Sequence, residues 1–192
     1  MKKVLLFCGV ESTGKSTAIK KVYNYLKSKG KKVKIVREAG RDVCAKDGGV
    51  FEMSLLSYEQ ILYLHQSNFL KAYADENMDI ILLDTDSTYT RYYLEKDEKL
   101  KNKPFAKDLI KLSEDIVKCN VKEGKISKVV YLNSDCPFVQ DGTRTYESTR
   151  KEDDKTLLNL YQKAYKNICI VKGENWQDRT KQIKEIANET IR

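Results

Sequence analysis

The chain has 192 residues, with 36 basic and 28 acidic side chains and a formal net charge of +8. Hydrophobic residues make up 41% and charged residues 33%, which excludes a wholly disordered chain and leaves enough apolar material for a core. The length fits one domain over 1–192 with a small lid. No apolar run approaches the roughly 18 residues that span a membrane, so we expect a soluble chain without a membrane partner.

The cysteines and the N-terminus favour a cytoplasmic protein. Five widely spaced cysteines and a single histidine predict neither a disulfide framework nor structural zinc. The apolar run 4–8 imitates a signal peptide, but it breaks at Gly9 and charge follows at once, so we interpret it as a buried strand. The positive charge suits nucleic acid, yet the lysines are scattered over every segment, so a nucleic-acid partner is not favoured.

Short apolar runs rich in Val and Ile alternate with longer amphipathic stretches. We expect parallel strands at 4–8, 33–36, 80–83, 129–132 and 168–171, and helices at about 15–29, 57–76, 105–122, 152–165 and 176–190. This alternation predicts an α/β fold, a three-layer sandwich whose sheet has the order 2-3-1-4-5. Segments 40–53 and 134–151 lack periodicity and are candidate mobile loops, the second being the expected lid.

The strongest motif lies between the first strand and the first helix. Residues 9–16 read GVESTGKS and match G-x-x-x-x-G-K-[ST], the P-loop pattern of nucleotide-binding proteins, in the context that this pattern requires. Its glycines let successive N–H groups face a phosphate, Lys15 neutralises the β- and γ-phosphates, and Ser16 ligates Mg²⁺. The residues expected to contact ATP are Gly9, Glu11, Ser12, Thr13, Gly14, Lys15, Ser16 and Thr17.

The second strand ends in the charged sequence REAGR, at 37–41. At this edge of the sheet Glu38 is placed to orient or deprotonate an acceptor hydroxyl, while Arg41 holds a polar or anionic group. The alternative is an exposed turn stabilised by Glu–Arg pairs.

The helix at 57–76 has Ser57 and Gln60 in capping-box spacing, with Leu56 placed to pack on Ile61. His65 falls on its apolar face, which favours a core position over a catalytic one. In the last helix, Trp176 begins an apolar stripe and is expected to pack rather than to bind a ligand.

The strand at 80–83 leads into Asp84-Thr85-Asp86, which brings carboxylates to the edge of the sheet where ligands of such folds bind. Asp84 is the natural Walker B residue, which holds Mg²⁺ through water or assists with the substrate proton. Asp86 either shares that task or caps the turn around Ser87 and Thr88.

Arginines follow the fourth strand in the lid segment. Guanidinium groups suit the charge on a transferring phosphoryl group, so Arg144 is the expected catalytic lid residue. Arg150 fits the role of a helix-start residue on solvent as well as it fits that of a lid arginine. Three aromatic residues are candidates to stack on a base, with no means of choosing among them: Phe51, Tyr89 and Tyr92.

The motifs GVESTGKST, REAGR, LLDTDST and YLNSDCPFVQDGTR resemble the ribosylnicotinamide kinase domain of NadR-type proteins from about 3 to 175, and Gln66 also fits that pattern. The resemblance implies an ATP-dependent kinase that phosphorylates the ribose hydroxyl of nicotinamide riboside. Glu38 and Asp84 would then lie at the acceptor hydroxyl. The resemblance places Asp135, Asp141 and Arg144 on the lid and substrate side. We also expect Arg41, Gln66 and Asp86 to bind substrate. Family members often carry an adenylyltransferase domain before the kinase; we expect none here, because the pattern begins at residue 3.

Two other functions stay open. One keeps the kinase chemistry but changes the acceptor to another nucleoside, a nucleoside monophosphate or a modified base hydroxyl in DNA. The other is a regulatory ATPase switch with no small acceptor.

Overall fold

The computed structural model of the chain describes residues 2–46, 53–139 and 148–191. Five parallel strands form one sheet in the order β2-β3-β1-β4-β5. The strands are β1 (Lys3–Cys8), β2 (Val33–Val36), β3 (Ile80–Asp84), β4 (Lys128–Leu132) and β5 (Ile168–Val171). Fold class and strand order are therefore confirmed.

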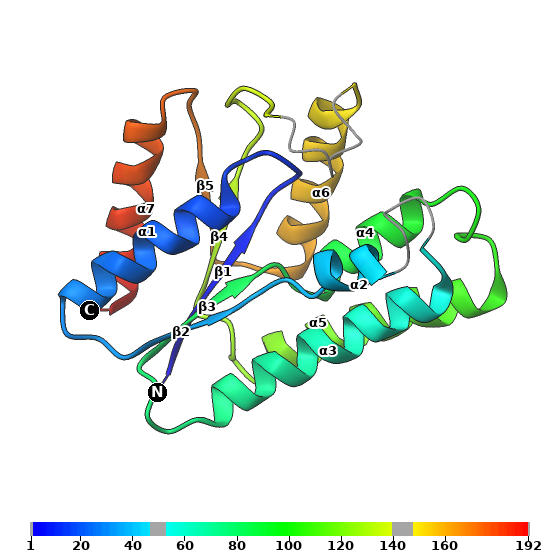
Figure 1. Cartoon of the computed structure of the whole chain (residues 1–192), viewed down its shortest axis with the longest axis horizontal. Helices are drawn as coiled ribbons and strands as arrows, with labels where there is room; N and C mark the ends of the chain where they lie inside the picture. The colour runs from blue at the N-terminus through cyan, green and yellow to red at the C-terminus, as the bar shows by residue number, and fades with distance from the viewer. Residues whose placement is uncertain (1, 47–52, 140–147, 192) are drawn as a thin grey trace.

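Helices cover both faces of this sheet, as Figure 1 shows. Helices α1 and α7 pack on one face, while α3, α4, α5 and α6 lie on the other. The described residues contain α1 (Lys15–Ser28), α2 (Gly40–Lys46), α3 (Leu55–Ala74), α4 (Ser87–Lys96), α5 (Pro104–Lys122), α6 (Arg150–Ala164) and α7 (Trp176–Ile191).

The central strand β1 is buried on both faces. Its residues Val4, Leu6 and Cys8 belong to the core beside α3, α4 and α6, whereas Leu5 and Phe7 belong to the core beside α1 and α7. This two-sided burial explains why the run is continuously apolar. Because β1 pairs with both β3 and β4, the segments that leave these three strands meet at one edge of the sheet.

Two helices were not predicted from the sequence. Helix α2 occupies the first half of a segment that we expected to be a loop, and α4 follows β3 directly. Helix α2 has only seven residues, and α4 is built largely of polar residues and tyrosines, so neither has the apolar periodicity by which a longer helix is recognised.

The N-cap of α3 lies three residues before the predicted cap Ser57. Its N-cap is Ser54, whose Oγ accepts a hydrogen bond from the Ser57 N–H, and the Ser57 hydroxyl accepts one from the Ser54 N–H in return. Ser57 thus occupies position N3 of the capping box rather than the N-cap position. The expected contact between Leu56 and Ile61 is wrong, because Leu56 is 68% exposed while Ile61 is buried.

Candidate nucleotide and acceptor site

The P-loop joins β1 to α1 at the carboxyl edge of the sheet, and both of its glycines are required by close neighbours. A Cβ on Gly9 (φ 139°) would lie 2.2 Å from the carbonyl oxygen of Leu132. A Cβ on Gly14 (φ 81°) would lie 2.8 Å from Cζ3 of Trp176. Trp176 therefore packs on the phosphate-binding loop, which confirms its packing role and gives that role a place in the site.

The loop closes around the ammonium group of Lys15. Lys15 Nζ donates to the carbonyl oxygens of Gly9 at 2.7 Å and Val10 at 3.0 Å. The Thr13 hydroxyl, fully buried, donates to the Val10 carbonyl at 2.9 Å. Ser12 has a left-handed φ of 59° and Gly14 one of 81°, with Thr13 between them, and alternation of backbone handedness is how main-chain N–H groups form a concave anion site. Ser16 and Thr17 present exposed side chains in the first turn of α1.

Asp84 ends β3 beside the P-loop, and its neighbours hold the backbone there. The residue pairs in register with Phe7, and its carbonyl oxygen lies 3.1 Å from Nε2 of the buried His65. Thr85, with a left-handed φ of 64°, donates its N–H to the Phe7 carbonyl at 2.9 Å. The core position expected for His65 is therefore confirmed.

Asp86 caps α4. Its carboxylate accepts from the Thr88 N–H at 3.0 Å and from the Tyr161 hydroxyl at 2.9 Å, and the Tyr165 hydroxyl donates to its second oxygen. The side chain is buried at 5% exposure. Of the two roles weighed for Asp86, the structure shows the cap.

Three carboxylates surround the Lys15 ammonium. Glu38 follows β2 and is half-buried. Burial lowers the Lys15 pKa overall, while the negative charges of Glu38, Asp84 and Glu11 oppose this shift. The ring of Tyr89 lies 5.1 Å from Lys15 Nζ, and burial and then the charge of Glu38 raise the pKa of its hydroxyl. The surroundings of the Lys15 ammonium are therefore acidic and aromatic.

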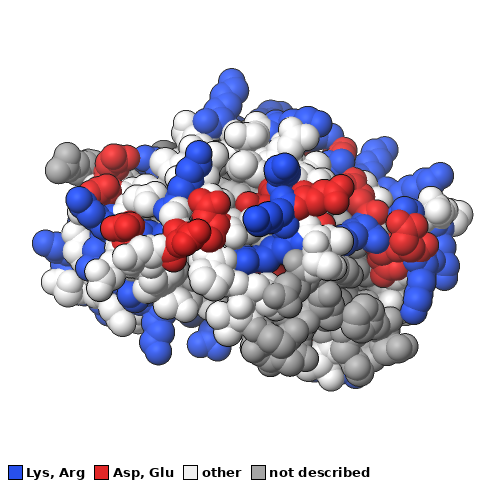
Figure 2. All heavy atoms as spheres, turned by 90° about the horizontal axis from the view of Figure 1, so that it is seen from above, with Lys and Arg blue, Asp and Glu red and all other residues white. Residues whose placement is uncertain are grey.

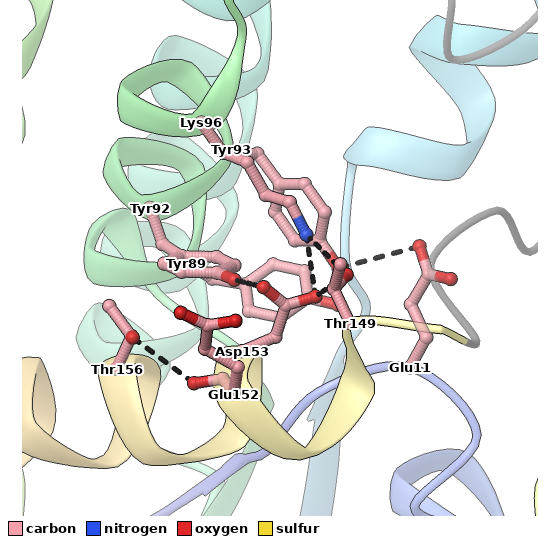
Figure 3. A network of polar contacts seen from close by, with 9 residues as sticks. All are labelled: Glu11, Tyr89, Tyr92, Tyr93, Lys96, Thr149, Glu152, Asp153 and Thr156. Carbon is pink, nitrogen blue, oxygen red and sulfur yellow. Dashed lines mark hydrogen bonds and ion pairs between the residues drawn. The ribbon is translucent and has the colours of Figure 1, made fainter.

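Glu11 points away from the P-loop and toward α4. The Tyr93 hydroxyl donates to Glu11 Oε1 at 3.4 Å and lies 3.1 Å from the Tyr89 hydroxyl. Glu11 thus contacts α4 through its side chain, and its expected contact with ATP stays a prediction. Figure 3 shows Glu11 reaching across to the tyrosines of α4.

Beside these tyrosines, a second part of the same network connects α4 to the start of α6. The Tyr92 hydroxyl and the Lys96 ammonium both donate to the carboxylate of Asp153, and Lys96 Nζ also donates to the Thr149 hydroxyl at 3.0 Å. Tyr92 is thus committed to a buried structural contact (Figure 3).

Other expected substrate residues lie elsewhere or are engaged in structural bonds. The Gln66 amide exchanges two hydrogen bonds with Asn120 of α5, at 3.2 and 3.3 Å. Asp135 accepts from Asn133 Nδ2 at 2.6 Å and from the Gly173 N–H at 3.1 Å, and these bonds lower its pKa. Three expected residues lie outside the described residues, namely Phe51, Asp141 and Arg144, and the side chain of Arg41 is likewise not described, although its backbone lies in α2.

The contacts that two arginines make with the P-loop were missed from the sequence. Arg150 is a helix-start residue, as one of its two alternatives had it, but at 8% exposure it does not lie on solvent, and Arg179 is fully buried. The burial of Arg179 could have been predicted from the sequence. This residue lies on the same helical stripe as Trp176 and Ile183, so a charged residue interrupts an otherwise apolar face.

Comparison with known proteins identifies the family. The model of the AAA domain matches residues 4–179. The chain belongs to the AAA domain family. No curated protein matches this AAA domain in sequence.

Solved structures share the fold of this AAA domain. The NadR protein in complex with NR has a TM-score of 0.75 at 16% identity, covering 98% of this chain and 50% of that chain. The NadR protein in complex with NAD and AMP-PNP has a TM-score of 0.73 at 18% identity, with coverages of 98% and 49%. A thymidylate kinase from Candida albicans has a TM-score of 0.57 at 14% identity, with coverages of 100% and 94%. The expected P-loop NTPase fold and its similarity to NadR are confirmed; the chain spans about half the length of the NadR chains.

None of the helices in the described ranges is both long and apolar enough to cross a bilayer. In the same part of the chain, no three His, Cys, Asp or Glu side chains group as ligands for a metal ion.

Proposed function

We propose that this AAA domain is an ATP-dependent kinase that transfers the γ-phosphoryl group of ATP to a ribose hydroxyl of nicotinamide riboside. The observation that carries the proposal is that the carboxylates of Glu38 and Asp84 interact electrostatically with the P-loop ammonium of Lys15. Phosphoryl transfer needs this combination, since a cation neutralises the phosphates and a carboxylate receives the acceptor proton.

Each residue then has a separate task. The N–H groups of the P-loop and Lys15 hold the ATP phosphates, and Glu38 or Asp84 accepts the proton as the acceptor oxygen bonds to the γ-phosphorus and ADP leaves. The hydroxyl of Ser16 and the carboxylate of Asp84 are hard oxygen donors that would hold Mg²⁺, and the bound cation would neutralise phosphate charge. Arg144, in the proposed lid 134–151, meets the charge of the phosphoryl group.

The negative charge around Lys15 and Tyr89 supports a cationic acceptor. Glu11, Glu38 and Asp84 all act electrostatically on Tyr89 and Lys15. A nucleoside monophosphate would bring its dianion close to these carboxylates, whereas the pyridinium ring of nicotinamide riboside is attracted by carboxylates and by aromatic faces. This electrostatic preference favours nicotinamide riboside over the monophosphates that a thymidylate kinase phosphorylates.

The face in Figure 2 gives nucleic acid little support. Its acidic side chains gather in a band, with lysines and arginines dispersed around them. A DNA-binding surface needs a continuous basic stripe, because affinity depends on neutralising many phosphates. We therefore keep DNA as an outcome of the test.

The decisive experiment measures phosphoryl transfer from Mg²⁺-ATP to separate acceptors. These are nicotinamide riboside, common nucleosides, thymidine monophosphate and hydroxymethylated DNA, with a reaction that lacks acceptor. We expect rapid, saturable transfer to nicotinamide riboside and slow ATP hydrolysis without acceptor. Transfer only to another acceptor would keep the kinase and discard the substrate, while equal ATP consumption without acceptor would identify a switch.

A matched pair of lysine variants tests the P-loop assignment. Lys15→Ala is expected to lower kcat/KM by about 100-fold or more, because the phosphates lose their cation. Lys20→Ala removes an exposed lysine from the same helix and is expected to retain full activity. Near-normal turnover in Lys15→Ala would refute the assignment.

A further inference from the structure

Two buried arginines lie behind the P-loop, on the side away from its N–H groups. Arg150 comes from the first turn of α6 and Arg179 from the first turn of α7, so they are 138 and 166 residues from the loop atoms that they contact. Among the residues that the structure describes, no carboxylate forms an ion pair with either guanidinium. Two buried charges without an ion-pair partner are costly, so their position calls for an explanation.

Arg150 binds two consecutive carbonyl groups of the P-loop. Its Nε donates to the Glu11 carbonyl at 3.2 Å and its Nη2 to the Ser12 carbonyl at 3.1 Å. Its Nη1 donates to the carbonyl of Cys136, in the segment after β4, at 2.8 Å. The Arg150 guanidinium thus joins the P-loop to the segment after β4, in which the proposed lid begins.

Arg179 binds the next carbonyl along the loop. Its Nη2 donates to the carbonyl oxygens of Thr13 at 3.1 Å and Asn133 at 3.0 Å, and its Nη1 to that of Gly173 at 3.2 Å. These contacts join the P-loop to the ends of β4 and β5. Together the two arginines hold the carbonyl groups of residues 11, 12 and 13.

Peptide geometry transmits this hold to the phosphate side. In a trans peptide the C=O of one residue and the N–H of the next point in opposite directions. Fixing three carbonyls on the arginine side therefore aims the N–H groups of Ser12, Thr13 and Gly14 toward the phosphate side. The same bonds retain Ser12 in its left-handed conformation, a strained state that persists only where its surroundings determine it.

We propose that Arg150 and Arg179 are positioning residues for phosphate binding, which preset the N–H groups of the P-loop and supply two positive charges that the bound polyphosphate compensates. This inference rests on the proposed function, because it takes the P-loop ligand to be a nucleoside polyphosphate. It predicts that both arginines contribute to affinity for phosphate groups and not for the nucleoside part of the ligand.

The test compares binding of ADP, tripolyphosphate and adenosine by calorimetry in the whole chain. In Arg150→Met we expect ADP and tripolyphosphate to bind about 10- to 100-fold more weakly, since hydrogen bonds from a charged group and its field are lost. Adenosine affinity and the melting temperature are expected to change little. A purely structural role would instead lower the melting temperature and weaken all three ligands together, which would overturn the inference.

Arg150→Lys keeps the charge but cannot bond three carbonyls with a planar fork, so we expect an intermediate loss of ADP affinity of about fivefold or more. If Arg150→Met does not fold, this variant decides the case. The control is Lys151→Met, which removes an exposed charge from the adjacent position.

ADP affinity within about twofold of the wild type in Arg150→Lys, or an equal loss in Lys151→Met, would refute the positioning role. Failure of the wild-type chain to bind ADP or tripolyphosphate would instead refute the proposed function, so the two failures are distinguishable.

Discussion

At the scale of single residues, Lys15 is the group whose chemistry the fold changes most directly. Lys15 is half-buried beside the Tyr89 ring, and its removal from water lowers its pKa from the ordinary value of 10.5 despite the opposing charges of Glu38 and Asp84. The fold therefore weakens the proton affinity of the one lysine that phosphate binding needs in its charged form.

This predicts an alkaline limit to nucleotide binding. As pH rises toward 10, Lys15 loses its proton at lower pH than a free lysine, so ADP affinity is expected to fall. Arginine stays charged throughout that range, and Lys15→Arg should bind ADP with an affinity that does not change with pH. Calorimetric Kd values between pH 7.5 and 10 check this expectation; parallel profiles for both proteins would contradict it.

At the scale of elements, α4 depends on the carboxylate that begins it. Asp86 caps the helix and also receives the hydroxyl groups of Tyr161 and Tyr165 from α6. One buried side chain thus joins two helices beside the site. Helix α4 in turn contains Tyr89, which lies beside Lys15, and Tyr93, which donates to Glu11.

We predict that Asp86→Ala lowers the free energy of unfolding by about 2–4 kcal/mol, through the lost cap and the tyrosine hydroxyls left without their acceptor. Asp86→Asn, which keeps one acceptor oxygen, should lose less. Urea unfolding measures both. A change below about 0.5 kcal/mol in Asp86→Ala would show that the carboxylate does not stabilise α4.

The same elements show what the sequence predicts and what it does not. The five strands follow from apolar runs, because both faces of a parallel sheet are buried, and the P-loop follows from a motif that is local in the chain. Helices α2 and α4 lacked such a local signal. The contacts of Arg150 and Arg179 with the P-loop were not predicted, because the carbonyl groups that accept these hydrogen bonds are far away in the sequence. The residue types along one segment do not indicate such distant partners.

At the scale of the whole molecule, folding buries the only histidine of the chain under the carboxyl edge of the sheet. His65 lies in α3 and contacts the end of β3, and burial lowers its pKa below the ordinary 6.5, although Asp86 and the bond to the Asp84 carbonyl oppose this shift. The unfolded chain therefore binds a proton at His65 at a higher pH than the native chain does.

The sign of the pH dependence follows directly. The contribution of His65 to stability is fully present above pH 6.5 and is lost as pH falls from there through its lower native pKa, with a slope of up to about 1.4 kcal/mol per pH unit. Because no other histidine titrates in this interval, His65→Gln should flatten the profile between pH 7.5 and 5.5. Urea unfolding across that range tests the prediction. An unchanged slope in the variant would show that groups other than His65 govern stability in this range.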